Sequence, residues 1–117
     1  MREFLIQYGM DWDRTMERFG YDESLYAECL TMLMDDPNPQ SLHEALESGN
    51  LPAAFEAAHT LKGVAANMGL IPLLSAISAL VEPLRHSLDA DYPALLAAFD
   101  HELSQVRALH SRLSDHQ

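Results

Sequence analysis

Residues 51–69 read LPAAFEAAHTLKGVAANMG, and this stretch decides the fold class. Its apolar residues recur at steps of three and four, which is the period of a helix with one buried face. They are Leu51, Ala54, Ala58, Leu61, Ala65 and Met68. Pro52 suits the first turn of a helix, where its missing N–H would be unbonded anyway, and Gly69 suits the cap beyond the last turn. We therefore expect one helix that opens at Pro52 and is closed by Gly69.

The rest of the chain shows the same helical period and almost no pattern typical of strands. Start and stop residues predict further helices over residues 3–8 and 12–19, and helices that begin near residues 22, 38, 72 and 93. Pro37 and Pro39 are expected to break or bend the helix that begins at Asp22, and Asn38 is expected to be the N-cap of the next helix. Pro83 is expected to kink or end its helix.

Short connections between long neighbouring helices favour antiparallel packing. We therefore predict an all-α fold: an antiparallel up-down four-helix bundle with short N-terminal capping helices. A chain of 117 residues leaves no room for a second large core, so residues 1–117 are expected to form one domain. Within it, residues 1–20 are the expected cap segment and residues 21–117 the expected bundle. The methionines Met32, Met34 and Met68 are expected to fill the core.

The charge balance limits the classes of partner. Eighteen Asp and Glu against seven Lys and Arg give a formal net charge of −11, which argues against nucleic acid and anionic membranes as partners. A single cysteine, Cys29, cannot form an intramolecular disulfide, so a reducing cytoplasm is the expected location. The N-terminus does not have the pattern of a signal peptide, and no apolar run is long enough to span a bilayer.

A histidine, a lysine and a glycine share one face of the helix predicted over residues 51–69. His59 lies about 100° around this helix from the apolar stripe and should therefore point to solvent. Lys62, the only lysine of the chain, and Gly63 follow three and four residues later on the same face. Glycine inside a helix costs roughly 1 kcal/mol relative to alanine. One reason to keep Gly63 is that a second protein can approach the imidazole closely there.

These residue types suit a phosphohistidine. A neutral imidazole, whose unperturbed pKa is about 6.5, is a competent nucleophile near pH 7. A nearby ammonium group offsets the negative charge of a bound phosphoryl group. The sequence has no Gly-rich phosphate loop, no Walker lysine, and no carboxylate pair at a predicted strand end. The chain is therefore expected to hold a phosphoryl group but not to take one from ATP.

The stretch His59-Thr60-Leu61-Lys62-Gly63, followed by Ala65-Ala66-Asn67-Met68-Gly69-Leu70, resembles the signature of histidine phosphotransfer (HPt) domains. These are four-helix-bundle intermediates of phosphorelays, and the resemblance covers residues 9–86 approximately. It implies that His59 is the phosphoacceptor and that Lys62 supports the phosphoryl group. It also implies that Gly63 leaves room for a docked receiver domain and that Gly69 closes the histidine helix.

Three further residues belong to the predicted phosphoryl-stabilising and receiver-docking set: Phe55, Ala66 and Arg85. Phe55 is either an edge of the core or part of an apolar docking rim. Arg85 either adds positive charge near the site or is an ordinary surface cation. The sequence departs from the family pattern at Val81, 22 residues after the histidine, where members usually carry a Glu or Gln that can hydrogen-bond the imidazole. It departs again at Pro37 and Pro39, which interrupt a helix that is often continuous.

The resemblance implies a monomeric cytoplasmic protein that carries a phosphoryl group between receiver-domain aspartates, or between a kinase and a receiver. The implied partners are response-regulator receiver domains and a sensor or hybrid histidine kinase. No cofactor is expected on this chain, and Mg²⁺ is expected only in the partner receiver, so the chain is not an enzyme on its own. One alternative is a non-phosphorylated adaptor that binds receiver or kinase domains. Another is a metal-dependent bundle enzyme, for which Glu56 and His59 supply one Glu-x-x-His pair where two are needed.

Overall fold

The computed structural model describes residues 1–115, and all its regular secondary structure in that range is helical. The helices in chain order are α1 (Arg2–Tyr8), α2 (Trp12–Arg18), α3 (Glu23–Met34), α4 (Asn38–Glu47), α5 (Leu51–Asn67), α6 (Ile71–Arg85) and α7 (Tyr92–Asp115). The predicted all-α class is therefore confirmed. Residues 116–117 of the predicted bundle lie outside the described part.

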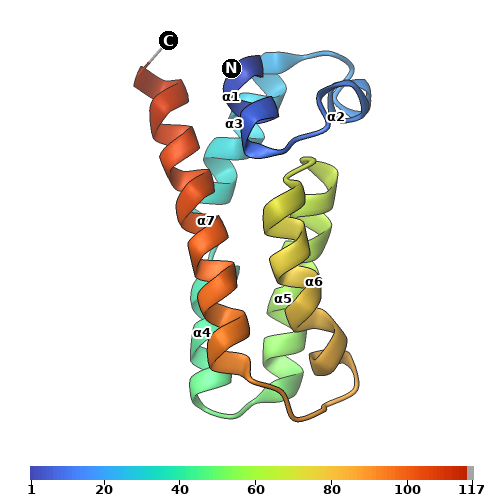
Figure 1. Ribbon diagram of the computed structural model, residues 1–117, viewed down its shortest axis with the longest axis vertical. Helices are drawn as coiled ribbons and strands as arrows, with labels where there is room; N and C mark the ends of the chain where they lie inside the picture. The colour runs from blue at the N-terminus through green and yellow to red at the C-terminus, as the bar shows by residue number, and fades with distance from the viewer. Residues whose placement is uncertain (116–117) are drawn as a thin grey trace.

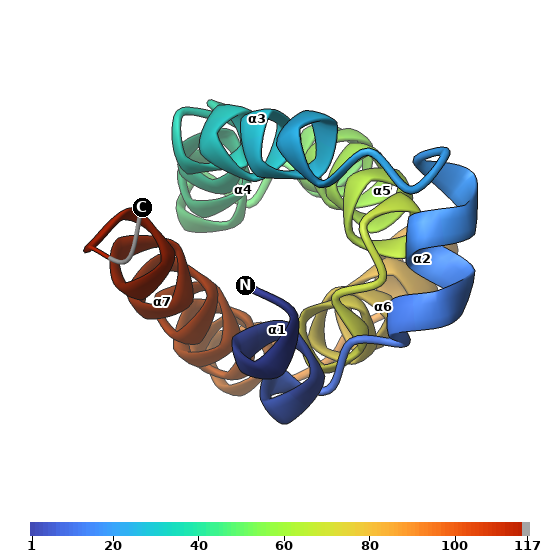
Figure 2. The same ribbon diagram turned by 90° about the horizontal axis from the view of Figure 1, so that it is seen from above.

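The helices form an elongated molecule of 42 × 25 × 20 Å, in which α7 also contacts α1 and α3. Helix α4 packs against α5, α5 against α6, and α6 against α7 (Figure 1). Helix α3 lies in line with α4 on the same side of the molecule, and α1 and α2 lie at the end where α5 gives way to α6 (Figure 1, Figure 2). None of the helices within residues 1–115 is long and apolar enough to cross a membrane.

Polar side chains cap the starts of three helices. Asp11, Asp22 and Asn50 each accept a hydrogen bond from the backbone N–H three residues later, at the beginnings of α2, α3 and α5. The start of α4 differs from the prediction. Asn38 is the first helical residue rather than the N-cap, and its backbone N–H donates to Asp36 Oδ1 at 2.8 Å. The carboxylate of Asp36 therefore accepts from the first backbone N–H of α4.

Pro37 lies in a break between two helices, as predicted, whereas Pro83 lies inside its helix near the end. The chain leaves the helical conformation between Met34 and Asn38, so the break at Pro37 is confirmed. Pro83 lies inside α6, which continues two residues further to Arg85. The Pro83 carbonyl accepts a hydrogen bond from the Leu88 N–H at 2.9 Å, just beyond the helix end.

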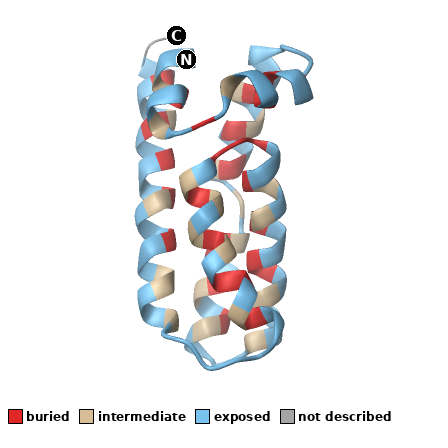
Figure 3. Ribbon diagram, turned by 45° about the vertical axis from the view of Figure 1, so that its right-hand side comes forward, coloured by how far each residue is buried: buried red, intermediate tan, exposed pale blue. Residues whose placement is uncertain are grey.

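One apolar core receives side chains from every helix and runs along the inner faces of the bundle (Figure 3). Met68 is buried, with 2% of its surface exposed, and Met34 is half-buried against the core. Met32 is 71% exposed, so its predicted place in the core is wrong. Helix α3 buries Tyr26, Leu30 and Leu33, and Met32 lies off that face.

Candidate functional site

His59 lies in the middle of α5, and its side chain is exposed, as the helical period predicted. The opposite face of α5 is buried and consists mainly of alanines: Ala54, Ala57, Ala58, Leu61 and Ala65. Small side chains let α4 and α6 pack close to the buried face of α5. The imidazole therefore stands on a well-packed helix and faces outward.

An aromatic ring and a guanidinium group lie next to His59. The centres of the Phe55 and His59 rings are 5.4 Å apart, and their planes meet at 66°, which is an edge-to-face arrangement. The guanidinium carbon of Arg85, on α6, lies 5.3 Å from the centre of the Phe55 ring. The structure thus brings Arg85 to the histidine, although 26 residues separate them in the sequence.

These side chains border an open depression of about 600 Å³ between α5 and the end of α6. Its lining residues are Pro52, Phe55, Glu56, His59, Thr60, Leu84, Arg85 and Ser87. A shallow site of this kind leaves one side of the imidazole open to a partner molecule. Glu56 is the one carboxylate in the lining, and Arg85 is the one cation.

The predicted docking residues continue along α5 from this depression. Gly63 and Ala66 are exposed, and Lys62 is half-buried. A β-carbon built on Gly63 would have no other atom within 4 Å. Packing against the described residues therefore gives no reason for a glycine at position 63.

Lys62 and Arg85 form no ion pair with a carboxylate of residues 1–115. The ion pairs found within residues 1–115 are Arg14 with Asp11, and His43 with Asp100. Lys62 and Arg85 are absent from both, in a chain with eighteen acidic side chains. Their charges are therefore available to an anion that reaches the exposed face of α5.

The His59 ring makes no hydrogen bond with any of the residues that the structure describes. Val81, at the position where a polar partner was expected from the resemblance, is fully buried, and Glu82 is exposed. The Thr60 hydroxyl donates to the backbone carbonyl of Glu56 at 3.0 Å, so it is engaged within α5. The imidazole contacts the ring of Phe55.

The metal-dependent alternative needs more ligands than Glu56 and His59 provide. Within residues 1–115, no group of three or more His, Cys, Asp or Glu side chains could hold a metal ion. The exposed Glu56 and His59 pair therefore has no third ligand in this part of the chain.

Gly69 closes α5 with the hydrogen bonds of a Schellman motif. The Gly69 N–H donates to the Ala66 carbonyl at 3.2 Å, and the Leu70 N–H donates to the Ala65 carbonyl at 3.0 Å. Gly69 has a φ of +66°, a conformation that costs little only for glycine. A β-carbon here would also overlap the Thr15 hydroxyl oxygen. The glycine is thus required twice, by its backbone angle and by the packing of α2.

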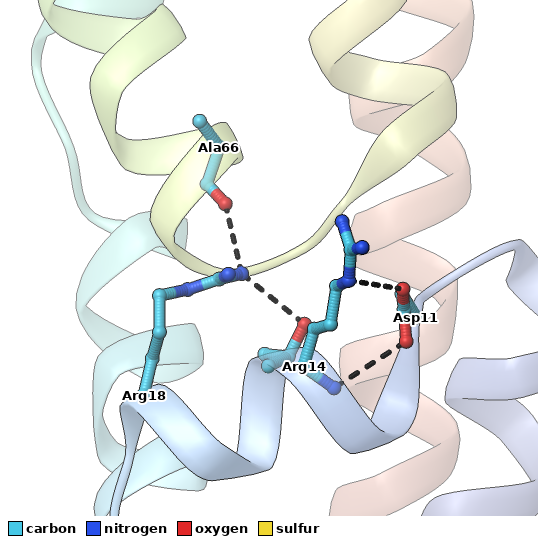
Figure 4. A network of polar contacts seen from close by, with 5 residues as sticks. Asp11, Arg14, Arg18 and Ala66 are labelled. Atoms are coloured by element: carbon cyan, nitrogen blue, oxygen red, sulfur yellow. Dashed lines mark hydrogen bonds and ion pairs between the residues drawn. The ribbon is translucent and has the colours of Figure 1, made fainter.

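Two residues that sequence reasoning missed bind the same end of α5. Arg18, on α2, donates from Nη2 to the Ala66 carbonyl at 3.2 Å (Figure 4). Its Nε donates to the Asn67 carbonyl at 3.1 Å. The Tyr26 hydroxyl, on α3, donates to the Met68 carbonyl at 2.8 Å, and burial raises the pKa of this hydroxyl. The N-terminal segment therefore fixes the end of the histidine helix. No local spacing links these residues to α5, so the sequence offered no signal for them.

Comparisons with known proteins agree with this geometry. A family model described as Hpt domain matches residues 29–109, a range that contains His59, Lys62, Gly63 and Arg85. The chain is also similar to the crystal structure of histidine-containing phosphotransfer protein B (HptB) from Pseudomonas aeruginosa PAO1. The two share 29% sequence identity with a TM-score of 0.78, and the alignment covers 92% of this chain and 96% of that chain. No curated protein sequence matches the chain.

Proposed function

This chain belongs to the Hpt domain family, and from that membership we propose that it accepts a phosphoryl group on His59 and passes it on. Histidine phosphotransfer in a phosphorelay is the function that the family match and the likeness to HptB support. The observation that carries the assignment to His59 is its position: an exposed imidazole in the middle of α5, one turn before Lys62 and the open face at Gly63.

The proposed chemistry is a displacement at phosphorus. The lone pair of the unprotonated ring nitrogen of His59 forms the N–P bond while the P–O bond of a receiver's aspartyl phosphate breaks. The receiver aspartate leaves as a carboxylate, and the other ring nitrogen of His59 keeps its proton. Transfer to the next receiver is the reverse reaction with a different aspartate as acceptor.

The neighbours of His59 take separate parts in this proposal. Lys62 and Arg85 offset the charge of the phosphoryl group, because neither cation is engaged by a carboxylate in the described part of the chain. Gly63 and Ala66 have no bulky side chains on the exposed face of α5, so that a receiver domain can approach the imidazole. Phe55 borders the same depression.

Several finer features belong to the same proposal. The chain acts as a monomer in the cytoplasm and has no ATP site, so it is not an enzyme alone. Its partners are receiver domains and a sensor or hybrid histidine kinase, and Mg²⁺ belongs to the receiver.

Helix α3 with α4, then α5, α6 and α7 make an antiparallel up-down four-helix bundle, with α1 and α2 as its cap. Residues 1–20 and 21–117 remain the proposed division into cap and bundle.

Labelling from a phosphorylated receiver tests the assignment. The wild-type chain should gain an acid-labile, base-stable phosphoryl group, and His59→Gln should gain none. His101→Gln, which changes an exposed histidine on α7, serves as the matched control and should label like wild type. Labelling of His59→Gln would contradict the assignment.

The adaptor remains the second candidate, because the His59 ring has no hydrogen-bond partner among residues 1–115 and Val81 is buried. An adaptor would bind a receiver domain with equal affinity before and after His59→Gln and would take up no label. Binding without labelling, measured with a panel of receivers and kinases, would therefore favour the adaptor.

A further inference from the structure

The His59 ring lies against an apolar side chain, the phenyl ring of Phe55. Phe55 lies one helical turn before His59, and side chains on a helix lean toward its N-terminus, so the imidazole lies over the phenyl ring. The rings meet edge to face at 5.4 Å. No hydrogen bond from residues 1–115 reaches the imidazole, and the Phe55 ring in contact with it can restrict its rotation.

Phe55 is itself held from two other directions. Its ring is half-buried and packs against the apolar core. The Arg85 guanidinium lies over it, 5.3 Å from the ring centre, in a cation–π contact. The phenyl ring is therefore a fixed surface, unlike the flexible side chains of an exposed helix face.

We infer that Phe55 is a positioning residue, which sets the orientation of the His59 ring for attack on phosphorus, and that Arg85 keeps Phe55 in place. The inference rests on the proposed phosphotransfer function. A ring nitrogen must be in line with the breaking P–O bond in the docked complex, and a freely rotating ring satisfies this condition only part of the time. Fixing the ring raises the rate within the complex without adding a contact to the receiver.

The test separates orientation from docking by single-turnover transfer from a phosphorylated receiver domain at increasing receiver concentration. Phe55→Leu keeps an apolar side chain at the core edge but removes the aromatic contact. We expect its rate at saturating receiver to fall roughly three- to tenfold, the range that the loss of one edge-to-face contact predicts. The receiver concentration for half-maximal rate should not change. Phe55→Tyr, which restores the ring, should restore the rate.

Two controls accompany this measurement. Phe4→Leu removes another half-buried phenyl ring beneath an arginine, since Arg112 lies 4.2 Å from the Phe4 ring centre, and it should transfer like wild type. Labelling by phosphoramidate, a small donor that meets the imidazole from solution, should be equal in wild type and Phe55→Leu. NMR should show one orientation of the His59 ring in wild type and averaging over several in Phe55→Leu.

The outcomes distinguish a failure of the positioning role of Phe55 from a failure of the proposed phosphotransfer. A wild-type rate at saturating receiver in Phe55→Leu would overturn the inference. A higher half-maximal concentration with an unchanged rate would overturn it too, and would make Phe55 part of a docking rim. Absence of label on wild-type His59 from any donor would instead refute the proposed function.

Discussion

Gly69 lies against the Thr15 side chain so closely that a β-carbon at position 69 would overlap the Thr15 hydroxyl oxygen. This relationship joins α2 to the end of α5, the helix that carries His59. Thr15 is fully buried, so its side chain cannot move aside into solvent. The end of the histidine helix is therefore specified by contacts from the N-terminal segment as well as by its own sequence.

Gly69→Ala should lower the free energy of unfolding by about 2–4 kcal/mol, because it combines a strained positive φ with the overlap at Thr15. Gly49→Ala is the matched control: Gly49 also has a positive φ, +71°, but a β-carbon there meets nothing within 4 Å. The control should lose only about 1 kcal/mol. Urea unfolding of both variants measures the difference, and equal losses would show that Thr15 gives way without cost.

Arg18→Leu should lower stability by about 1 kcal/mol, because the carbonyls of Ala66 and Asn67 lose their hydrogen bonds from the guanidinium group. Hydrogen exchange should rise in the last turn of α5 more than elsewhere. Arg14→Leu removes a cation from the same helix whose ion pair with Asp11 is long, 3.8 Å, and exposed. That control should change stability by less than about 0.5 kcal/mol. Indistinguishable exchange in the two variants would refute the capping role of Arg18.

Alkaline pH should destabilise the fold through Tyr26. Burial raises the pKa of Tyr26 above its ordinary value of about 10, so the folded protein keeps the phenolic proton where the unfolded chain loses it. The stability from this group is complete below about pH 10 and falls as the pH rises further. Tyr26→Phe should cost about 1 kcal/mol at pH 7, through the lost bond to Met68, and should make the alkaline fall shallower.

Part of the loss of stability at alkaline pH should remain in Tyr26→Phe, because burial and Glu102 also raise the pKa of Tyr8. The double variant with Tyr8→Phe should therefore show the flattest profile between pH 9 and pH 11. Denaturant unfolding at fixed pH values provides the measurement. A Tyr26→Phe profile parallel to that of wild type would contradict the assignment.

The helices could be predicted because their signals are local. Asp11, Asp22 and Asn50 cap helices through hydrogen bonds that span three residues, and the apolar stripe of α5 is visible within one segment. The N-cap predicted at Asn38 is wrong, because Asn38 is already helical and its N–H donates to the Asp36 carboxylate. The core position predicted for Met32 is wrong, because helix α3 carries more apolar residues than one buried face needs.

In the candidate site too, the residues on one helix could be predicted from the sequence, and the contacts between helices could not. His59, Lys62 and Gly63 share one helix, so helical geometry alone places them on one face. The contact between Arg85 and Phe55 depends on how α6 packs on α5, and no spacing within either helix encodes it. The contacts of Arg18 and Thr15 with the end of α5 join segments about fifty residues apart, and these became apparent only in the structure.

Gly63 should separate stability from transfer. Gly63→Ala should stabilise the protein by up to about 1 kcal/mol, because the position lies inside α5 and a β-carbon there meets open space. Gly63→Gln should slow transfer from a receiver domain but leave labelling by phosphoramidate unchanged. Ala108→Gln, at an exposed position of α7, controls for a glutamine on a helix surface. Transfer by Gly63→Gln at the wild-type rate would show that the close-approach explanation is wrong.

Lys62 has two possible tasks, and kinetics at saturating receiver distinguish them. If the lysine is only a docking charge, Lys62→Ala should weaken receiver association, and added salt should imitate the effect in wild type. If its ammonium contacts the phosphoryl group, Lys62→Ala should slow transfer or change the phosphohistidine lifetime even at saturation. We expect the second result, because Lys62 has no carboxylate partner within residues 1–115 and lies one turn from His59.

Arg107→Ala, which removes an exposed cation from α7, changes the net charge equally and should leave the saturated rate intact. A saturated rate and a phosphohistidine lifetime in Lys62→Ala that both match wild type would reduce Lys62 to a docking charge, with Arg85 then the one cation left beside the imidazole.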